Sequence, residues 1–230
     1  MKNELNTKNF RQGVLDYFYL LDRNYPQKGT LKLVGDRYKL TGDQRTVLYR
    51  GISRGSYSNA RKKRITKNIE NKILIIDGYN VLFTILNYRL GKPLFIGNDG
   101  ILRDAGSLHG KLRNEDIFHE CITLLLNYLI PENPQFLNIF LDSPVSHSAN
   151  HKYAIEKALA DFSLNGSCKL VKSPDFEIKR SSEGIICTSD TVIINKTKNL
   201  IVDLPRSVLE KNFKCTFLKI EDILNPANTG

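Results

Sequence analysis

The 230-residue sequence has no tryptophan, one methionine and only four cysteines. The cysteines lie far apart with no CxxC pair, which argues against a structural zinc site and favours reduced thiols. No apolar run approaches the roughly 18 residues that a membrane helix needs. The opening residues, MKNELNTKNF, lack the apolar segment of a secretory signal. We therefore expect a globular cytoplasmic protein with no membrane partner.

The sequence also lacks several motifs of nucleotide-binding and hydrolytic enzymes. There is no GxGxxG after the first apolar strand and no GxxxxGK[ST], which excludes the usual dinucleotide and P-loop sites. There is no GxSxG nucleophile elbow. "DGYN" at residues 77–80 has no second Asp two residues after the first, unlike the phosphatases that use an aspartate nucleophile.

Acidic residues are scarce in the first third of the chain. Residues 1–71 contain 16 Lys and Arg against 6 Asp and Glu, whereas residues 72–230 contain 18 of each. The net charge of +10 therefore belongs to the N-terminal part, which predicts a polyanionic partner for it. The alternative is a solvated basic face that serves only solubility.

Apolar residues at helical spacing predict helices over residues 8–54. Thr41 followed by Gln44 fits a capping box, and the short turn RYKLT at residues 37–41 gives a helix-turn-helix-like pair. Such pairs are often only structural. The side chains expected to contact nucleic acid are Arg45, Arg50, Arg54, Arg61, Lys62, Lys63 and Arg64.

From residue 73, short apolar segments alternate with helical patterns. This alternation predicts an α/β domain with a mostly parallel sheet flanked by helices on both faces. Strands are expected at 73–76, 136–141, 168–172, 184–188, 200–204 and 215–220, and helices at 80–88, 114–130, 148–164 and 205–211. The predicted organisation is a small all-α domain (1–56), a basic linker or frayed helix (57–71), the α/β domain (72–222) and a tail (223–230).

Three of the expected strands are followed within two residues by an aspartate: Asp77, Asp142 and Asp190. The carboxyl ends of parallel strands meet at one sheet edge, where ligands bind. A single Asp there is usually a helix cap or turn residue. Three together repel one another unless a cation neutralises them, and an all-oxygen site suits Mg²⁺ or Mn²⁺.

The polar segment 93–113 is expected to be an ordered excursion over this sheet edge. Asp104 or Asp99 is a candidate for a further metal ligand, and Asp99-Gly100 is alternatively a simple turn. Arg103 and His109 are candidate substrate contacts.

Hydroxyl side chains lie close in sequence to two of the three aspartates. Ser143 and Ser146 come after Asp142, and Ser189 precedes Asp190. We expect Ser143, Ser146 and Ser189 to contact a substrate phosphate, and a serine from the 143–148 segment to cap the next helix. His147 and His151 are four residues apart but have no third ligand nearby, which predicts surface residues.

The segments "IIDGYNVL", "LDSPVSHS" and "TSDTVII" resemble those of PIN-like and NYN-type ribonuclease domains. In those domains an Asp at the end of strand one, an Asn three residues on and Asp residues ending later strands bind the catalytic Mg²⁺ or Mn²⁺. The resemblance implies a catalytic set of Asp77, Asn80, Asp142 and Asp190, and metal ligands Asp77, Asp104, Asp142 and Asp190. PIN nucleases also carry an acidic residue on the central helix, for which Glu120 and Asp116 are the candidates.

The order of a short helical domain followed by "DGYNVL" and "DG…RD…HG" also resembles a prokaryotic family with a PIN-like domain. The implied function is a metal-dependent nuclease, an endoribonuclease acting on RNA rather than DNA. Two alternatives stay open: a non-catalytic nucleic-acid-binding protein with a degenerate PIN-like domain, and a small-nucleotide phosphohydrolase. A homo-oligomer is also left open.

Overall fold

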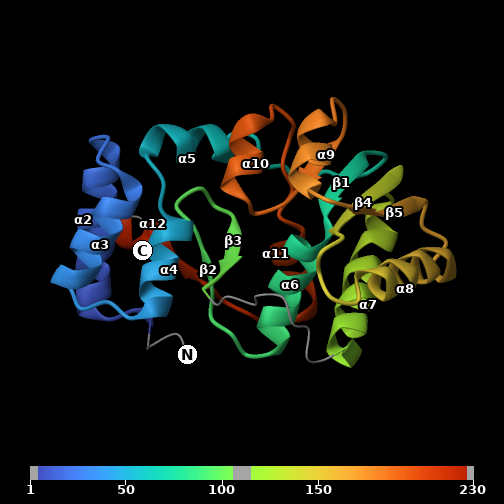
Figure 1. Ribbon diagram of the computed structural model, residues 1–230, viewed down its shortest axis with the longest axis horizontal. Coiled ribbons are helices and arrows are strands. Elements are labelled where there is room, and N and C mark those ends of the chain that lie inside the picture. The colour runs from blue at the N-terminus through green and yellow to red at the C-terminus, as the bar shows by residue number, and fades with distance from the viewer. Residues whose placement is uncertain (1–4, 106–114, 227–230) are drawn as a thin grey trace. The chain divides into compact units, whose positions relative to one another are not determined.

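The computed structural model describes residues 5–105 and 115–226, which fold into two compact units (Figure 1). The first, here called the helical unit, contains the described residues up to Lys63, from Leu90 to Ala105 and from Thr216 onward. The second, the sheet unit, contains Arg64–Arg89 and the described residues up to Cys215. No described helix is long and apolar enough to cross a membrane.

The N-terminal segment of the helical unit is all-helical, as predicted, and a small sheet completes the unit. Thr41 and Gln44 form the predicted capping box, with Thr41 Oγ1 accepting from the Gln44 amide. The helices are α2 (Lys8–Asp22), α3 (Gln27–Arg37), α4 (Gly42–Gly51), α5 (Gly55–Lys62) and α12 (Ile220–Leu224). The strands are β2 (Leu94–Ile96), β3 (Leu102–Asp104) and β7 (Leu218–Lys219), in the order β3-β2-β7.

The core of the helical unit joins three separate parts of the chain. Phe10 and Val14 of α2 are buried in one cluster with Phe95 of β2 and Ile220 of α12. Gly51 allows this packing, because a Cβ there would lie 2.4 Å from the ring of Phe95. The helices therefore bury their apolar faces partly on strands that follow much later in the sequence.

The boundaries of the two units differ from the predicted domains. Residues 55–62 form α5 of the helical unit, as the helix alternative for this segment predicted, and the 94–104 segment is a β-hairpin that belongs to the helical unit instead of the α/β domain. The strand expected at 215–220 is the two-residue β7, which pairs with β2. An apolar pattern indicates a strand but does not indicate its partner, which is why the pairing was missed.

The sheet unit has a four-stranded sheet in the order β5-β4-β1-β6, with every pair parallel. Its strands are β1 (Ile73–Asp77), β4 (Phe136–Asp142), β5 (Gly166–Val171) and β6 (Ile185–Cys187). Its described helices are α6 (Gly78–Arg89), α7 (Glu115–Glu132), α8 (Ser148–Asp161), α9 (Pro174–Arg180), α10 (Thr191–Lys196) and α11 (Leu204–Asn212). The predicted α/β architecture with a parallel sheet flanked by helices is confirmed.

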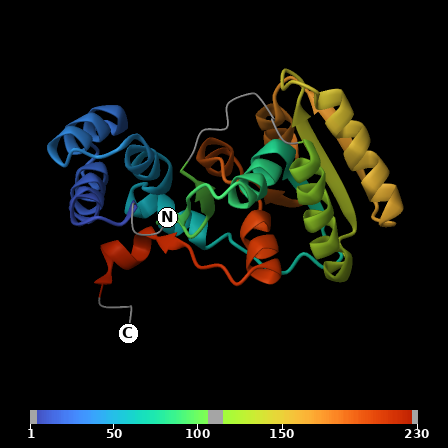
Figure 2. The same cartoon turned by 90° about the horizontal axis from the view of Figure 1, so that it is seen from below.

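Helices cover both faces of this sheet (Figures 1 and 2). On one face, Ile75 and Ile186 of the strands are buried with Ile178 of α9 and Ile193 of α10. Helices α6, α7 and α8 pack side by side on the other face. The prediction of a strand at 200–204 is wrong. In this segment only Ile201 forms isolated β-bridges, because α11 begins at Leu204.

Candidate functional site at the carboxyl edge of the sheet

The path of the chain through the sheet reverses beside β1. From β1 the chain moves to β4 and then β5 on one side, and β6 returns to the opposite side of β1. In open parallel sheets, ligands bind beyond the carboxyl ends of the strands at such a reversal. The segments that follow β1 and β6 therefore flank the position where a ligand is expected.

Side-chain hydrogen bonds join these two segments. Asp77, the last residue of β1, is buried, and its Oδ2 accepts a hydrogen bond of 2.8 Å from Thr188 Oγ1. Asn80 Oδ1 accepts from the backbone N–H and the hydroxyl of Ser189, at 2.8 and 3.1 Å. Gly78 lets α6 begin directly after Asp77, because a Cβ there would lie 2.5 Å from Leu141 Cδ2. The structure thus brings Asp77, Asn80 and Ser189 together as one polar group.

The charge of Asp77 has little compensation. Burial raises the pKa of Asp77 to about 7; the negative charges of Asp142 and Asp190 also raise it, whereas hydrogen bonds from Thr188 and the Asn80 backbone lower it. Burial also raises the pKa of Asp142. No described basic side chain contributes to the shift at Asp77. The three predicted carboxylates therefore interact electrostatically at one sheet edge.

Asp190 has a structural role as well. Its Oδ1 accepts from the backbone N–H groups of Val192 and Ile193, at 2.6 and 3.3 Å, and so caps α10. The helix-cap alternative is confirmed for this residue. A cap bond engages one carboxylate oxygen, and the charge still raises the pKa of Asp77.

The orientation of Asn80 limits what it binds. A backbone N–H only donates, so the contact with Ser189 identifies the bound atom of Asn80 as its oxygen. The amide NH₂ is then the group left for a ligand. Asn80 consequently suits an anionic oxygen, such as that of a phosphate, better than a cation.

Carboxylate oxygens are the donors that this site offers to a divalent cation. Within residues 5–105 and 115–226, no group of three or more His, Cys, Asp and Glu side chains is arranged to hold a metal ion. Mg²⁺ usually keeps several waters and binds one or two carboxylates plus substrate phosphates, rather than a closed protein cage. The carboxylates of Asp77 and Asp142 fit such a hydrated ion in their chemistry.

The serines beyond β4 behave differently from the prediction. The N-cap of α8 is His147, with φ of 62° and no side-chain cap bond, so the expected serine cap is wrong. Ser148 Oγ instead donates to the carbonyl of Ser143 at 3.0 Å. Ser143 and Ser146 are exposed, and their contact with phosphate stays a prediction.

His151 is buried, which contradicts its expected place on the surface. Its Nδ1 lies 2.9 Å from the Tyr79 hydroxyl and its Nε2 lies 3.1 Å from Glu115 Oε2. Burial lowers the pKa of His151 below its ordinary value, against the opposing effect of Glu115. His151 shares a helix face with the buried Ile155 and Leu159, and this spacing was the sequence signal for its burial.

Asp104 and Arg103, predicted at the same site, belong to the helical unit. Asp104 pairs with Arg50 at 3.0 Å. Arg103 is buried and binds Asp99 with two 2.8 Å contacts, and Arg61 binds the same carboxylate at 2.9 Å. Burial disfavours the charge of Asp99, but the two arginines outweigh it and lower its pKa to about 2. The contacts of these side chains are therefore structural, and the predicted contact residue His109 lies outside the described residues.

The predicted nucleic-acid-binding side chains are mostly engaged within the protein. Arg61 is buried, whereas Lys63 is exposed and Arg54 is half-buried. Besides Arg50 and Arg61, the engaged cations and their partners are Arg45 with Asp36, Lys62 with Glu221, and Arg64 with the carbonyls of Ile194 and Thr197.

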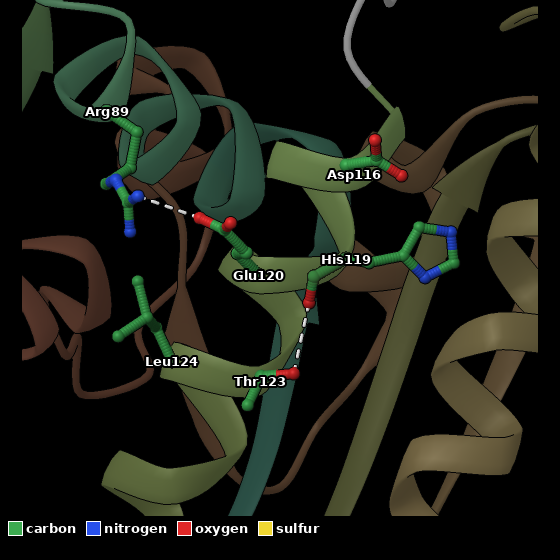
Figure 3. A pocket seen from close by; sticks show the side chains of 6 residues that line it. All are labelled: Arg89, Asp116, His119, Glu120, Thr123 and Leu124. Atoms are coloured by element: carbon green, nitrogen blue, oxygen red, sulfur yellow. Dashed lines mark hydrogen bonds and ion pairs between the residues drawn. The ribbon is translucent and has the colours of Figure 1, made fainter.

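A shallow hollow of about 510 Å³ lies on the sheet unit, lined by side chains of α6 and α7 (Figure 3). Its lining residues are Arg89, Asp116, His119, Glu120, Thr123 and Leu124. Glu120 is exposed and pairs with Arg89 at 2.7 Å, as Figure 3 shows. The predicted metal residues are not part of this lining, so the hollow is distinct from the carboxylate group.

The sheet unit is thus an α/β fold with interacting carboxylates where its chain path reverses. Residues 66–207 match the family described as "Domain of unknown function (DUF5616)", and residues 9–64 match "Protein of unknown function (DUF434)". The chain belongs to the DUF5616 family. The two matches meet close to Lys63, where the described chain passes from the helical unit to the sheet unit.

The chain is also similar to a protein of Methanocaldococcus jannaschii, "Uncharacterized protein MJ0935". The two are 31% identical over 199 residues, which cover 85% of this chain and 94% of that protein. No solved structure gives a significant match.

Proposed function

We propose that the chain is a metal-dependent nuclease that hydrolyses phosphodiesters of RNA at the carboxyl edge of the parallel sheet. The observation that carries this proposal is Asp77, a buried carboxylate beside Asp142 and Asp190 with its pKa raised to about 7. A divalent cation is the chemical partner that such a group lacks. The same carboxylates carry the resemblance to PIN-like nucleases.

Asp77 and Asp142 would hold the ion, with Asp190 adding negative charge nearby. When bound, such an ion lowers the pKa of a water molecule and neutralises charge on the phosphate. Thr188 orients Asp77 through the 2.8 Å hydrogen bond. Asn80, oriented by Ser189, would donate to a phosphate oxygen, and the exposed hydroxyls of Ser143 and Ser146 would add further donors.

The experiment compares cleavage of labelled single-stranded RNA by the full chain in Mn²⁺, in Mg²⁺ and in EDTA. The variant Asp77→Asn keeps the side-chain shape and removes the charge. Asp161→Asn is the matched control, because Asp161 is an exposed aspartate at the end of α8. We expect metal-dependent cleavage by the wild type and the control, and a loss of more than about 100-fold in Asp77→Asn.

Cleavage that persists in EDTA and in Asp77→Asn would refute the assignment. A chain that releases phosphate from mononucleotides and leaves RNA intact would be a phosphohydrolase instead. RNA binding without cleavage in either metal would identify the non-catalytic alternative.

A further inference from the structure

Exposed tyrosines gather at one end of the helical unit. Tyr19, Tyr25, Tyr49 and Tyr57 are 54%, 52%, 41% and 48% exposed, whereas Tyr17 of the same unit is fully buried. They come from α2, the α2–α3 turn, α4 and α5. A group of exposed aromatic rings on one unit marks an interaction surface rather than ordinary surface composition.

Two hydrogen bonds bring these four segments together. Gln27 Nε2, at the start of α3, donates to the carbonyl of Tyr49 at 3.0 Å. The backbone N–H of Gly55, at the start of α5, donates to Asp22 Oδ1 at the end of α2, at 2.9 Å. Figure 1 shows the α2–α3 turn and α5 at the same end of the unit. The segments that carry the four exposed tyrosines are therefore joined to one another, and these four residues are here called the tyrosine surface.

Cationic side chains come from the same segments as these tyrosines. Arg23 lies over the ring of Tyr19, with Cζ 3.4 Å from the ring centroid, and the exposed Lys28 follows in the first turn of α3. Arg54 is the N-cap residue of α5. Asp22, at the end of α2, already has one carboxylate oxygen bonded to the backbone N–H of Gly55. By sequence, the helical unit holds 17 Lys and Arg against 9 Asp and Glu.

We propose that the tyrosine surface binds single-stranded nucleic acid, whose bases stack on the tyrosine rings while the surrounding cations contact the phosphates. Stacking on exposed aromatic rings beside a basic surface is how proteins bind single strands without reading their sequence. Paired bases in a duplex do not offer their faces, so the surface discriminates against double strands. This binding does not depend on the proposed nuclease activity.

The surface also replaces the binding region expected from sequence. The predicted set contained Arg45, Arg50 and Arg61, whose guanidinium groups are held by aspartates. The tyrosine surface shares only Arg54 with that set. Aromatic rings, rather than the 61–64 run of cations, are its defining groups.

The test measures binding of a fluorescent single-stranded RNA, the matching DNA and the duplex by anisotropy. The full chain is kept in EDTA so that metal-dependent cleavage does not interfere. The binding result can then be interpreted even if the nuclease proposal fails. We expect Tyr19→Ala and Tyr25→Ala to weaken single-strand binding at least about fivefold each, and the Phe variants to retain it. Affinity should also fall linearly on a log–log plot against salt.

Tyr153→Ala is the matched control, because Tyr153 is a 70% exposed tyrosine on α8 of the sheet unit. Binding by this control should equal that of the wild type, and all variants should show unchanged thermal unfolding. Wild-type affinity in the Ala variants of the tyrosine surface, an equal loss in the control, or tighter binding of the duplex would each overturn the proposal. Loss of self-association without any effect on nucleic acid would instead assign the surface to a protein contact and refute it.

Discussion

Thr188 Oγ1 donates a hydrogen bond of 2.8 Å to Asp77 Oδ2, although 111 residues separate the two in the sequence. The same hydroxyl oxygen accepts from the backbone N–H of Asp190 at 3.2 Å. One threonine therefore orients the carboxylate that ends β1 and the residue that caps α10. This hydrogen bond joins the end of β1 to the segment after β6. The ionisation of Asp77 therefore depends on a single hydroxyl group.

Replacing Thr188 by Val should destabilise the ionised form of Asp77. The substitution removes the side-chain donor, so the pKa of Asp77 rises further and the free energy of unfolding at pH 8 falls by about 1–3 kcal/mol. Urea denaturation of the wild type and the variant measures this change. Thr188→Ser keeps the hydroxyl and should lie close to the wild type; equal losses in both variants would point to packing instead.

Asp77→Asn should change how stability depends on pH. The pKa of Asp77 is about 7 in the folded chain against an ordinary value of 3.8, so between these values the folded state holds a proton that the unfolded state has lost. Stability consequently falls as the pH rises from about 4 to about 7 and stays lowered above that.

The Asn variant has no such titration. The free energy of unfolding of Asp77→Asn, relative to that of the wild type, should therefore rise by on the order of 4 kcal/mol between pH 4 and pH 8. Denaturant titrations across this range check the sign, and Asp161→Asn should show no comparable trend. Parallel stability curves for the wild type and Asp77→Asn would contradict the raised pKa.

His151→Gln should act in the opposite direction. The pKa of His151 is lowered from its ordinary 6.5 by burial, so the unfolded chain takes up a proton first as the pH falls. Wild-type stability is then lost below about pH 6.5, and the Gln variant should lose less of it. Thermal unfolding at pH 5.0 and 7.5 measures the difference. The exposed His119→Gln serves as the comparison, and an identical pH response in the two variants would argue against the buried Tyr79–His151–Glu115 contact.

Asp99→Asn should destabilise the helical unit strongly. The change leaves Arg61 and Arg103 buried without the carboxylate that both contact, and breaking a buried ion pair in this way costs about 3–5 kcal/mol. Glu221→Gln breaks the more exposed pair with Lys62 and should cost less than about 1 kcal/mol. Chemical denaturation followed by circular dichroism separates the two, and similar small losses would contradict the buried network.

A fragment of residues 1–64 should not fold cooperatively, although it contains the whole of the DUF434 match at residues 9–64. It lacks Phe95, Ile220 and Ile223, which are buried in the same cluster as the apolar faces of α2 and α4. Helices without that cover expose their apolar faces and are marginal in water. Thermal unfolding of the fragment beside the full chain tests this, and a sharp transition with native-like helix content would refute the three-part core.

Local sequence patterns were sufficient to predict the strands that carry Asp77 and Asp142. The apolar runs before Asp77 and Asp142 predicted β1 and β4 with their ends placed to within one residue, because buried parallel strands are predominantly apolar. The capping box at Thr41 and Gln44 was equally readable, since both partners lie within one helical turn. These predictions depended only on neighbours in the sequence.

The tertiary structure decided the rest through contacts between distant residues. Phe95 and Ile220 complete the core of the helical unit. Asp99 forms buried ion pairs with Arg61 and Arg103. His151 is buried in contact with Tyr79 and Glu115. The composition of each segment allowed several partners, and packing selected one of them. The sequence by itself therefore determined which carboxylates follow the strands of the sheet. Only the fold determined that Thr188 and Ser189 meet Asp77 and Asn80, because parallel pairing of β1 with β6 places those loops side by side.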